Sequence, residues 1–188
     1  KTGAGACEEQ GVMDEVDVYF ATFAKSMASV GAFFAGDTAI MRYMKYNMRS
    51  QIYAKSLAMP IVVGARKRLA MIKNDTTQKD KLWTIVNALQ SGLKARGFDL
   101  GETNSCVTPV YMKGSVEEAQ ALVYDMRENH SVFCSIVVYP VIPKGMILLR
   151  LIPTASHTLE DVQITLEAFS AVAARLKAGD YKVLAANF

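Results

Sequence analysis

Residues 18–36 read Val18-Tyr19-Phe20-Ala21-Thr22-Phe23-Ala24-Lys25-Ser26-Met27-Ala28-Ser29-Val30-Gly31-Ala32-Phe33-Phe34-Ala35-Gly36. An apolar run leads to one lysine inside a bend of small residues, and a second apolar run leads away from it. We therefore expect Lys25 to be buried. A buried ammonium without a partner is costly, so such a lysine pairs with a carboxylate or loses its proton. The neutral amine is a nucleophile that can form a Schiff base with an aldehyde.

The residues around this lysine predict two short strands followed by helices. β-branched and aromatic residues dominate 17–22 and 30–35, which are too short for helices, so we predict two buried strands. Asp37 is the predicted N-cap of a helix that ends near Met48. The segment 50–56 is predicted to be irregular. A helix is predicted at 57–72, with Pro60 in its first turn.

The sequence pattern in the second half of the chain predicts a small sheet covered by helices. Asn74-Asp75-Thr76 is the best boundary, so we predict domains at 1–75 and 76–188. Ser115 with Glu118, and Thr158 with Asp161, have the spacing of capping boxes. This alternation is typical of a mixed α and β domain. The predicted elements are helices at 77–96, 115–128 and 159–176 and strands at 106–112, 132–139 and 145–152.

Composition excludes several functional classes. The chain is 51% hydrophobic and 21% charged, as in an ordinary soluble protein. No apolar run reaches the roughly 20 residues of a membrane span. The net charge of +3 is spread over scattered basic residues, so no nucleic-acid partner is predicted. Cys7, Cys106 and Cys134 lack the spacing of a metal site or a disulfide framework, which predicts no metal and favours the reducing cytoplasm.

Two motifs resemble the α-oxoamine synthases. Thr22-Phe23-Ala24-Lys25-Ser26, followed by Ser29-Val30-Gly31, is similar to the motif that carries the cofactor lysine of that family. The order of 138–145, then Leu149-Arg150-Leu151 and Ala155-Ser156-His157-Thr158, is similar to its C-terminal signature. The similarity covers almost the whole chain. The family uses pyridoxal 5'-phosphate (PLP) to condense an amino acid with an acyl-CoA, with loss of carbon dioxide.

The resemblance implies roles for four residues. Lys25 would hold PLP as a Schiff base, and the Thr22 hydroxyl would bind its phosphate. Ser56 belongs to a segment that, in dimers of this family, reaches the phosphate site of the neighbouring subunit, although Ala54 and Lys55 replace the hydroxyls often found there. Arg150 would bind the carboxylate of the amino acid, which suits a planar guanidinium.

A structural interpretation stands beside each chemical one. Lys25 could be an exposed strand-end lysine, and Thr22 a turn residue. Arg150 could pair with an internal Asp or Glu. His157 could act as a base, but its place before Thr158 favours a role in starting the last helix.

The resemblance also implies the fold and the extent of the whole enzyme. It is an α/β enzyme of PLP-dependent transferase fold type I, like aspartate aminotransferase. This chain would supply the end of the large domain and the complete α+β C-terminal domain. Its first residues resemble a glycine-rich loop that follows the Asp and His of the cofactor site. We therefore expect the C-terminal half of a longer homodimeric enzyme with its active site at the interface, inactive by itself.

The substrates are less strongly indicated. Lys25-Ser26, with Ser29-Val30-Gly31, looks like the serine palmitoyltransferase form of the motif, so serine is preferred. The stretch 139–145 looks like glycine C-acetyltransferase, and 8-amino-7-oxononanoate synthase is a further alternative. An aminotransferase of the same fold and a non-catalytic subunit stay open as well, although Lys25 argues against the latter.

Overall fold

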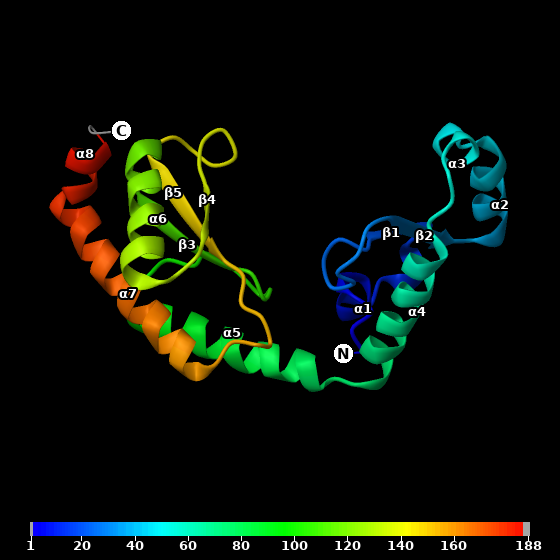
Figure 1. Cartoon of the computed structure of the whole chain (residues 1–188), viewed down its shortest axis with the longest axis horizontal. Coiled ribbons are helices and arrows are strands. Elements are labelled where there is room, and N and C mark those ends of the chain that lie inside the picture. The colour runs from blue at the N-terminus through cyan, green and yellow to red at the C-terminus, as the bar shows by residue number, and fades with distance from the viewer. Residues whose placement is uncertain (1, 186–188) are drawn as a thin grey trace. The chain divides into compact units, whose positions relative to one another are not determined.

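A computed structural model describes residues 2–185 of the chain (Figure 1). It divides into two compact units, residues 1–76 and 77–188. No helix in the described part is long and apolar enough to cross a membrane. The elements are α1 (Ala6–Gln10), a 3-10 turn η1 (Met13–Glu15), β1 (Val18–Thr22), β2 (Ala32–Gly36), α2 (Thr38–Asn47), α3 (Arg49–Tyr53), α4 (Met59–Asn74), α5 (Thr77–Ala95), β3 (Thr108–Lys113), α6 (Val116–His130), β4 (Ser135–Val137), β5 (Met146–Leu151), α7 (Leu159–Ala178) and α8 (Asp180–Ala185).

The first unit is built on the hairpin of β1 and β2. The strands pair antiparallel, with Thr22 opposite Ala32 next to the bend. Both strands form where they are predicted, but the prediction that they are buried is wrong. Their residues alternate between exposed and half-buried positions or are exposed. Among the described residues of this unit, only two apolar side chains, Phe23 and Ala65, are buried, so little core is available to cover the strands.

Local hydrogen bonds explain the helices of this unit. Asp37 caps α2 as predicted, since its carboxylate accepts from the backbone N–H of Ala39 at 2.7 Å. Pro60 lies in the first turn of α4, as predicted. The irregular segment predicted at 50–56 is partly wrong, because α3 forms there. The backbone N–H groups of Gln51 and Ile52 both donate to the carbonyl of Met48 at 3.0 Å, which starts a new helical turn directly after α2.

The second unit packs three helices against a three-stranded antiparallel sheet of order β3-β5-β4. One face of the sheet carries Val110, Ile147 and Leu149, all fully buried in one core with side chains of α5, α6 and α7. Because successive side chains of a strand point to opposite faces, Arg150 stands on the other face. Its cross-strand neighbours are Pro109 on β3 and Ser135 on β4.

Reciprocal caps start α6 and α7, as their sequences predict. The Ser115 hydroxyl accepts from the Glu118 backbone N–H at 3.2 Å, and the Glu118 carboxylate accepts from the Ser115 backbone N–H at 2.8 Å. Thr158 and Asp161 form the same pair of bonds at 2.7 and 3.2 Å. Each cap satisfies backbone donors that a helix start leaves free.

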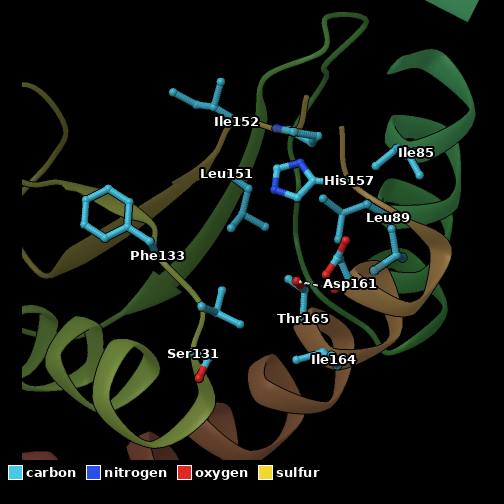
Figure 2. A pocket seen from close by; sticks show the side chains of 13 residues that line it. Ile85, Leu89, Ser131, Phe133, Leu151, Ile152, His157, Asp161, Ile164 and Thr165 are labelled. Atoms are coloured by element: carbon cyan, nitrogen blue, oxygen red, sulfur yellow. Dashed lines mark hydrogen bonds between the residues drawn. The ribbon is translucent and has the colours of Figure 1, made fainter. Parts of the chain in front are cut away.

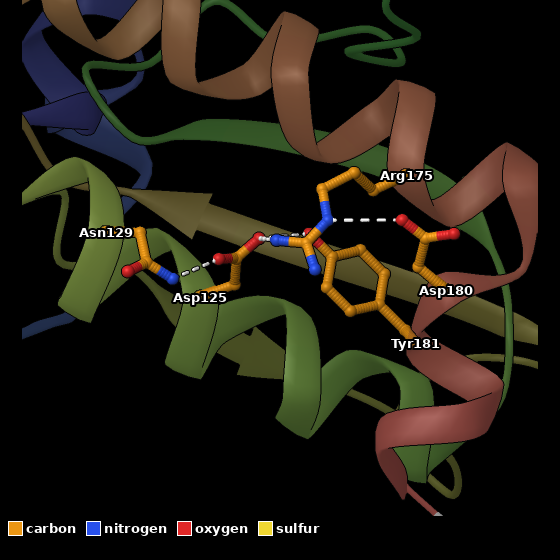
Figure 3. Close-up of polar contacts among 5 residues, drawn as sticks. All are labelled: Asp125, Asn129, Arg175, Asp180 and Tyr181. Carbon is orange, nitrogen blue, oxygen red and sulfur yellow. Dashed lines mark hydrogen bonds and ion pairs between the residues drawn. The ribbon is translucent and has the colours of Figure 1, made fainter.

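Helix α8 is not predicted from the sequence and is held by a polar cluster (Figure 3). The buried Asp125 carboxylate accepts from the hydroxyl of fully buried Tyr181, from Arg175 Nη1 and, at 2.6 Å, from Asn129 Nδ2. Arg175 Nε also donates to Asp180 at 3.3 Å. Side-chain bonds to α6 and α7 therefore hold α8, which is too short to be stable by itself.

Candidate functional site

Lys25 lies in a tight loop between β1 and β2. The Lys25 carbonyl accepts from the backbone N–H of Ala28 at 2.8 Å, and the Phe23 carbonyl accepts from that of Ser29 at 2.8 Å. The Phe23 backbone N–H donates to the Gly31 carbonyl at 2.9 Å. Phe23 is buried, with its ring stacked on Phe33 at a centroid distance of 5.7 Å. The loop is thus closed by its own backbone bonds and by one aromatic anchor.

The predicted burial of Lys25 is wrong for this chain, because the side chain is exposed. The prediction assumed that apolar strands on both sides of a residue bury it. Burial depends on what packs over the loop, and the first unit has only Phe23 and Ala65 as buried apolar side chains among its described residues. The amine is therefore accessible to a reactant from outside this unit.

Thr22 and Ser56 are also exposed. Thr22 is the last residue of β1, three positions before the lysine. Gly31 has a φ of +100°, and a Cβ there would lie 2.7 Å from Leu57 Cδ2. Only glycine therefore lets Leu57, the neighbour of Ser56, pack this closely against the bend. The close contact places Leu57 against the bend that carries Lys25.

Arg150 belongs to the second unit and is exposed. Its Nε donates to Ser135 Oγ at 3.1 Å. Within the part of the chain that the structure describes, no carboxylate binds Arg150. The alternative of an internal salt bridge is therefore not realised among these residues, and the charge is available for an external anion. Ser135 was missed because the sequence does not reveal which residue of β4 lies opposite Arg150.

A pocket of about 340 Å³ lies elsewhere in the second unit (Figure 2). None of the four predicted site residues lines it. Its polar groups serve local structure: His157 Nδ1 accepts from the Thr154 backbone N–H at 2.9 Å, and Asp161 caps α7. Hydrogen bonds from Thr158 hold the pKa of Asp161 below its ordinary value. His157 thus helps to order the start of the last long helix, as predicted.

Comparisons with known proteins extend this description. Residues 2–169 match the aminotransferase class I and II family. The cysteate-C-fatty acyltransferase of Capnocytophaga ochracea is 59% identical over 185 residues, which are 98% of this chain and 44% of that protein. The serine palmitoyltransferase of Sphingobacterium spiritivorum is 33% identical over 165 residues, or 88% of this chain and 41% of that protein.

A solved structure is also similar. The serine palmitoyltransferase variant of S. paucimobilis with bound PLP-myriocin aldimine matches with a TM-score of 0.82 and 27% identity. The match covers 94% of this chain and 44% of that one. The chain thus spans less than half the length of the relatives that it matches.

Proposed function

Because the chain belongs to the aminotransferase class I and II family, we propose that it works in a PLP-dependent α-oxoamine synthase. The reaction joins the α-carbon of an amino acid to a fatty acyl group from acyl-CoA and releases CoA and carbon dioxide. Cysteate is the amino acid in this proposal. The observation that carries it is the 59% identity to a cysteate-C-fatty acyltransferase over almost the whole chain.

Serine is the second candidate substrate. The motif of Lys25-Ser26 with Ser29-Val30-Gly31 favours it, as does the likeness to serine palmitoyltransferases at 33% identity. The two amino acids share the carboxylate and amine and differ in the side-chain group, a sulfonate or a hydroxyl. Direct comparison of the two substrates separates the candidates.

The residues at the bend fit PLP by their chemistry. The cofactor presents an aldehyde and a phosphate, and the bend presents the amine of Lys25 and the hydroxyls of Thr22 and Ser26 within five residues. Bound PLP supplies an electron sink for the charge that develops at the α-carbon. Lys25 Nζ would hold the cofactor covalently and would accept the α-proton of the substrate. The Thr22 hydroxyl would donate a hydrogen bond to the phosphate of the cofactor.

The remaining roles belong to Arg150 and to the assembly. Arg150 binds the substrate carboxylate until it leaves as carbon dioxide, through two parallel hydrogen bonds. The enzyme is a homodimer in which Ser56 of one subunit serves the phosphate site of the other. A cytoplasmic location suits the free thiols of Cys7, Cys106 and Cys134.

Replacement of Lys25 tests this proposal in the full-length enzyme. We expect Lys25→Ala to lack the imine absorbance band of the cofactor, which in the parent disappears when borohydride reduces the C=N bond. Release of CoA from palmitoyl-CoA with cysteate should fall by about 1,000-fold or more, since the covalent attachment and the proton acceptor are lost together. Lys67→Ala, on the exposed surface of α4, is the matched control and should behave as the parent.

Two outcomes would contradict the proposal. One is CoA release that Lys25→Ala leaves unchanged. The other is a parent enzyme that transfers amino groups without releasing CoA, as an aminotransferase does. A higher kcat/KM for serine than for cysteate would leave the proposed reaction class unchanged and would make serine the substrate.

A further inference from the structure

Ser135 on β4 contacts the predicted substrate-binding arginine. The two residues lie opposite each other in the register of β4 and β5. Arg150 Nε donates to Ser135 Oγ at 3.1 Å, and Ser135 Oγ donates to the Arg150 carbonyl oxygen at 3.5 Å. Ser135 is half-buried, whereas the arginine is exposed. The contact therefore ties an exposed side chain to a neighbouring strand.

This contact leaves one edge of the guanidinium free. A guanidinium has five N–H donors in a planar fork, one on Nε and four on the terminal nitrogens. Ser135 takes the Nε donor. Among residues 2–185, no hydrogen-bond or ion-pair partner occupies the terminal nitrogens. Two parallel donors on Nη1 and Nη2 are thus left for a planar anion.

We infer that Ser135 is a positioning residue that makes Arg150 bind the substrate carboxylate through its two terminal nitrogens. The inference rests on the proposed function. A free arginine would lose rotamer freedom when it binds, and the bond to Ser135 orders the side chain beforehand. A carboxylate could also bind a guanidinium along the edge formed by Nε and one terminal nitrogen. Ser135 blocks this second mode, because it occupies Nε. It touches the arginine and not the reacting atoms.

Kinetics of the full-length enzyme test the inference. We expect Ser135→Ala to raise the KM for the amino acid by about tenfold, because one charge-assisted hydrogen bond to Arg150 is lost. The value of kcat should stay within about twofold of the parent value. Ser135→Thr keeps the hydroxyl in a strand and should restore most of the affinity. Ser170→Ala is the matched control, because it also removes a hydroxyl bond, to the Leu166 carbonyl, in the same unit.

A carboxylate-free amine gives a readout that a structural defect would not produce. Taurine, which is cysteate without its carboxylate, should perturb the cofactor absorbance equally in the parent and in Ser135→Ala. In an Arg150→Ala background, Ser135→Ala should have no further effect on KM. Equal KM values in parent and Ser135→Ala would overturn the inference. An equal loss of affinity for taurine and for cysteate in Ser135→Ala would overturn it as well.

A second measurement separates this inference from the proposed function. In enzyme labelled with ¹⁵N-arginine, the Nε–H of Arg150 should exchange with water more slowly in the parent and in Ser135→Thr than in Ser135→Ala. A parent that releases no CoA with any amino acid would overturn the proposed function, while the exchange rates still decide whether Ser135 orders the arginine. Equal exchange in parent and Ser135→Ala would overturn the ordering itself.

Discussion

Gly92 lies where α5 passes α7, and its missing side chain sets how closely the two helices approach. A Cβ at this position would lie 2.4 Å from Leu166 Cδ1 and 2.9 Å from Leu166 Cδ2. Leu166 is only 5% exposed, so it has no open space into which to turn. The sequence gives no hint of this role, because a glycine inside a helical pattern is simply unfavourable.

Gly92→Ala should destabilise the second unit. Alanine favours a helix over glycine by up to about 1 kcal/mol. Overpacking against Leu166 opposes this gain, and we expect a net loss of about 1–2 kcal/mol. Urea unfolding followed by circular dichroism measures the change. Gly64→Ala is the control, since its Cβ meets only the flexible end of Arg68. A variant as stable as the parent would show that Leu166 repacks around the new methyl group with no loss in the free energy of unfolding.

Arg150 illustrates what can be predicted for single residues. The sequence predicts its place in an apolar strand, and it does lie in β5. Its bond to Ser135 could not be predicted, because that depends on strand register across a connection of eight residues between β4 and β5. The burial predicted for Lys25 failed for a related reason: burial is a property of the surroundings and not of the flanking run.

Among the elements, α8 shows how side-chain chemistry holds a short helix. Burial alone would raise the pKa of Asp125, but hydrogen bonds from Tyr181 and Asn129 and the charge of Arg175 outweigh it and hold that pKa below its ordinary value. Burial and the bond to Asp125 raise the pKa of Tyr181. The ionised carboxylate is therefore preferred in the folded state, together with the neutral phenol.

Tyr181→Phe should weaken this cluster and change its response to acid. Because the folded-state pKa of Asp125 is lowered, its stabilising effect is complete above the unfolded value of about 3.9 and is lost as the pH falls through the lower folded value. Removal of the hydroxyl should cost about 1–2 kcal/mol near neutral pH. It should also move the acid unfolding midpoint to higher pH, since the carboxylate loses a donor.

Urea unfolding between pH 2 and pH 7 measures both effects. Tyr139→Phe is the matched control, because its ring is more than half exposed. An unchanged acid midpoint in Tyr181→Phe would contradict the part assigned to the hydroxyl.

Local sequence signals predicted the helix starts well and the short helices poorly. Asp37, Ser115 and Thr158 cap helices as expected, because a cap needs only residues that are close in sequence. Helices α3 and α8 have five and six residues and no such signal. Tertiary contacts decide helices this short, since isolated ones are marginal in water.

At the scale of the whole molecule, the fold class predicted from the two motifs is confirmed. The chain has the mixed α/β arrangement of the serine palmitoyltransferase that it resembles at a TM-score of 0.82. Its two units differ in how much core they contain. Most of the buried apolar side chains of the described residues lie in 77–182, with Phe23 and Ala65 the exceptions. The assignment of the units to a large and a small enzyme domain stays a prediction.

Separate expression of the two units should reveal this difference. Residues 77–188 should unfold cooperatively in urea, because they hold a continuous core of sheet and helices. Trp83 is the single tryptophan of the chain and reports on this unit by its fluorescence. Residues 1–76 should lack a cooperative transition. A sharp transition in 1–76 alone would show that its exposed surfaces need no partner for stability.

If Arg150 has the role proposed for it, the position of β5 in the middle of its sheet has a consequence for the design of inhibitors. Its main chain is paired to a strand on each side, so Arg150 is attached to a backbone that is difficult to displace. An anionic compound aimed at this arginine would have to adapt to the protein. Chemists should therefore keep its acid group small and planar and place all structural variation at the far end of the molecule.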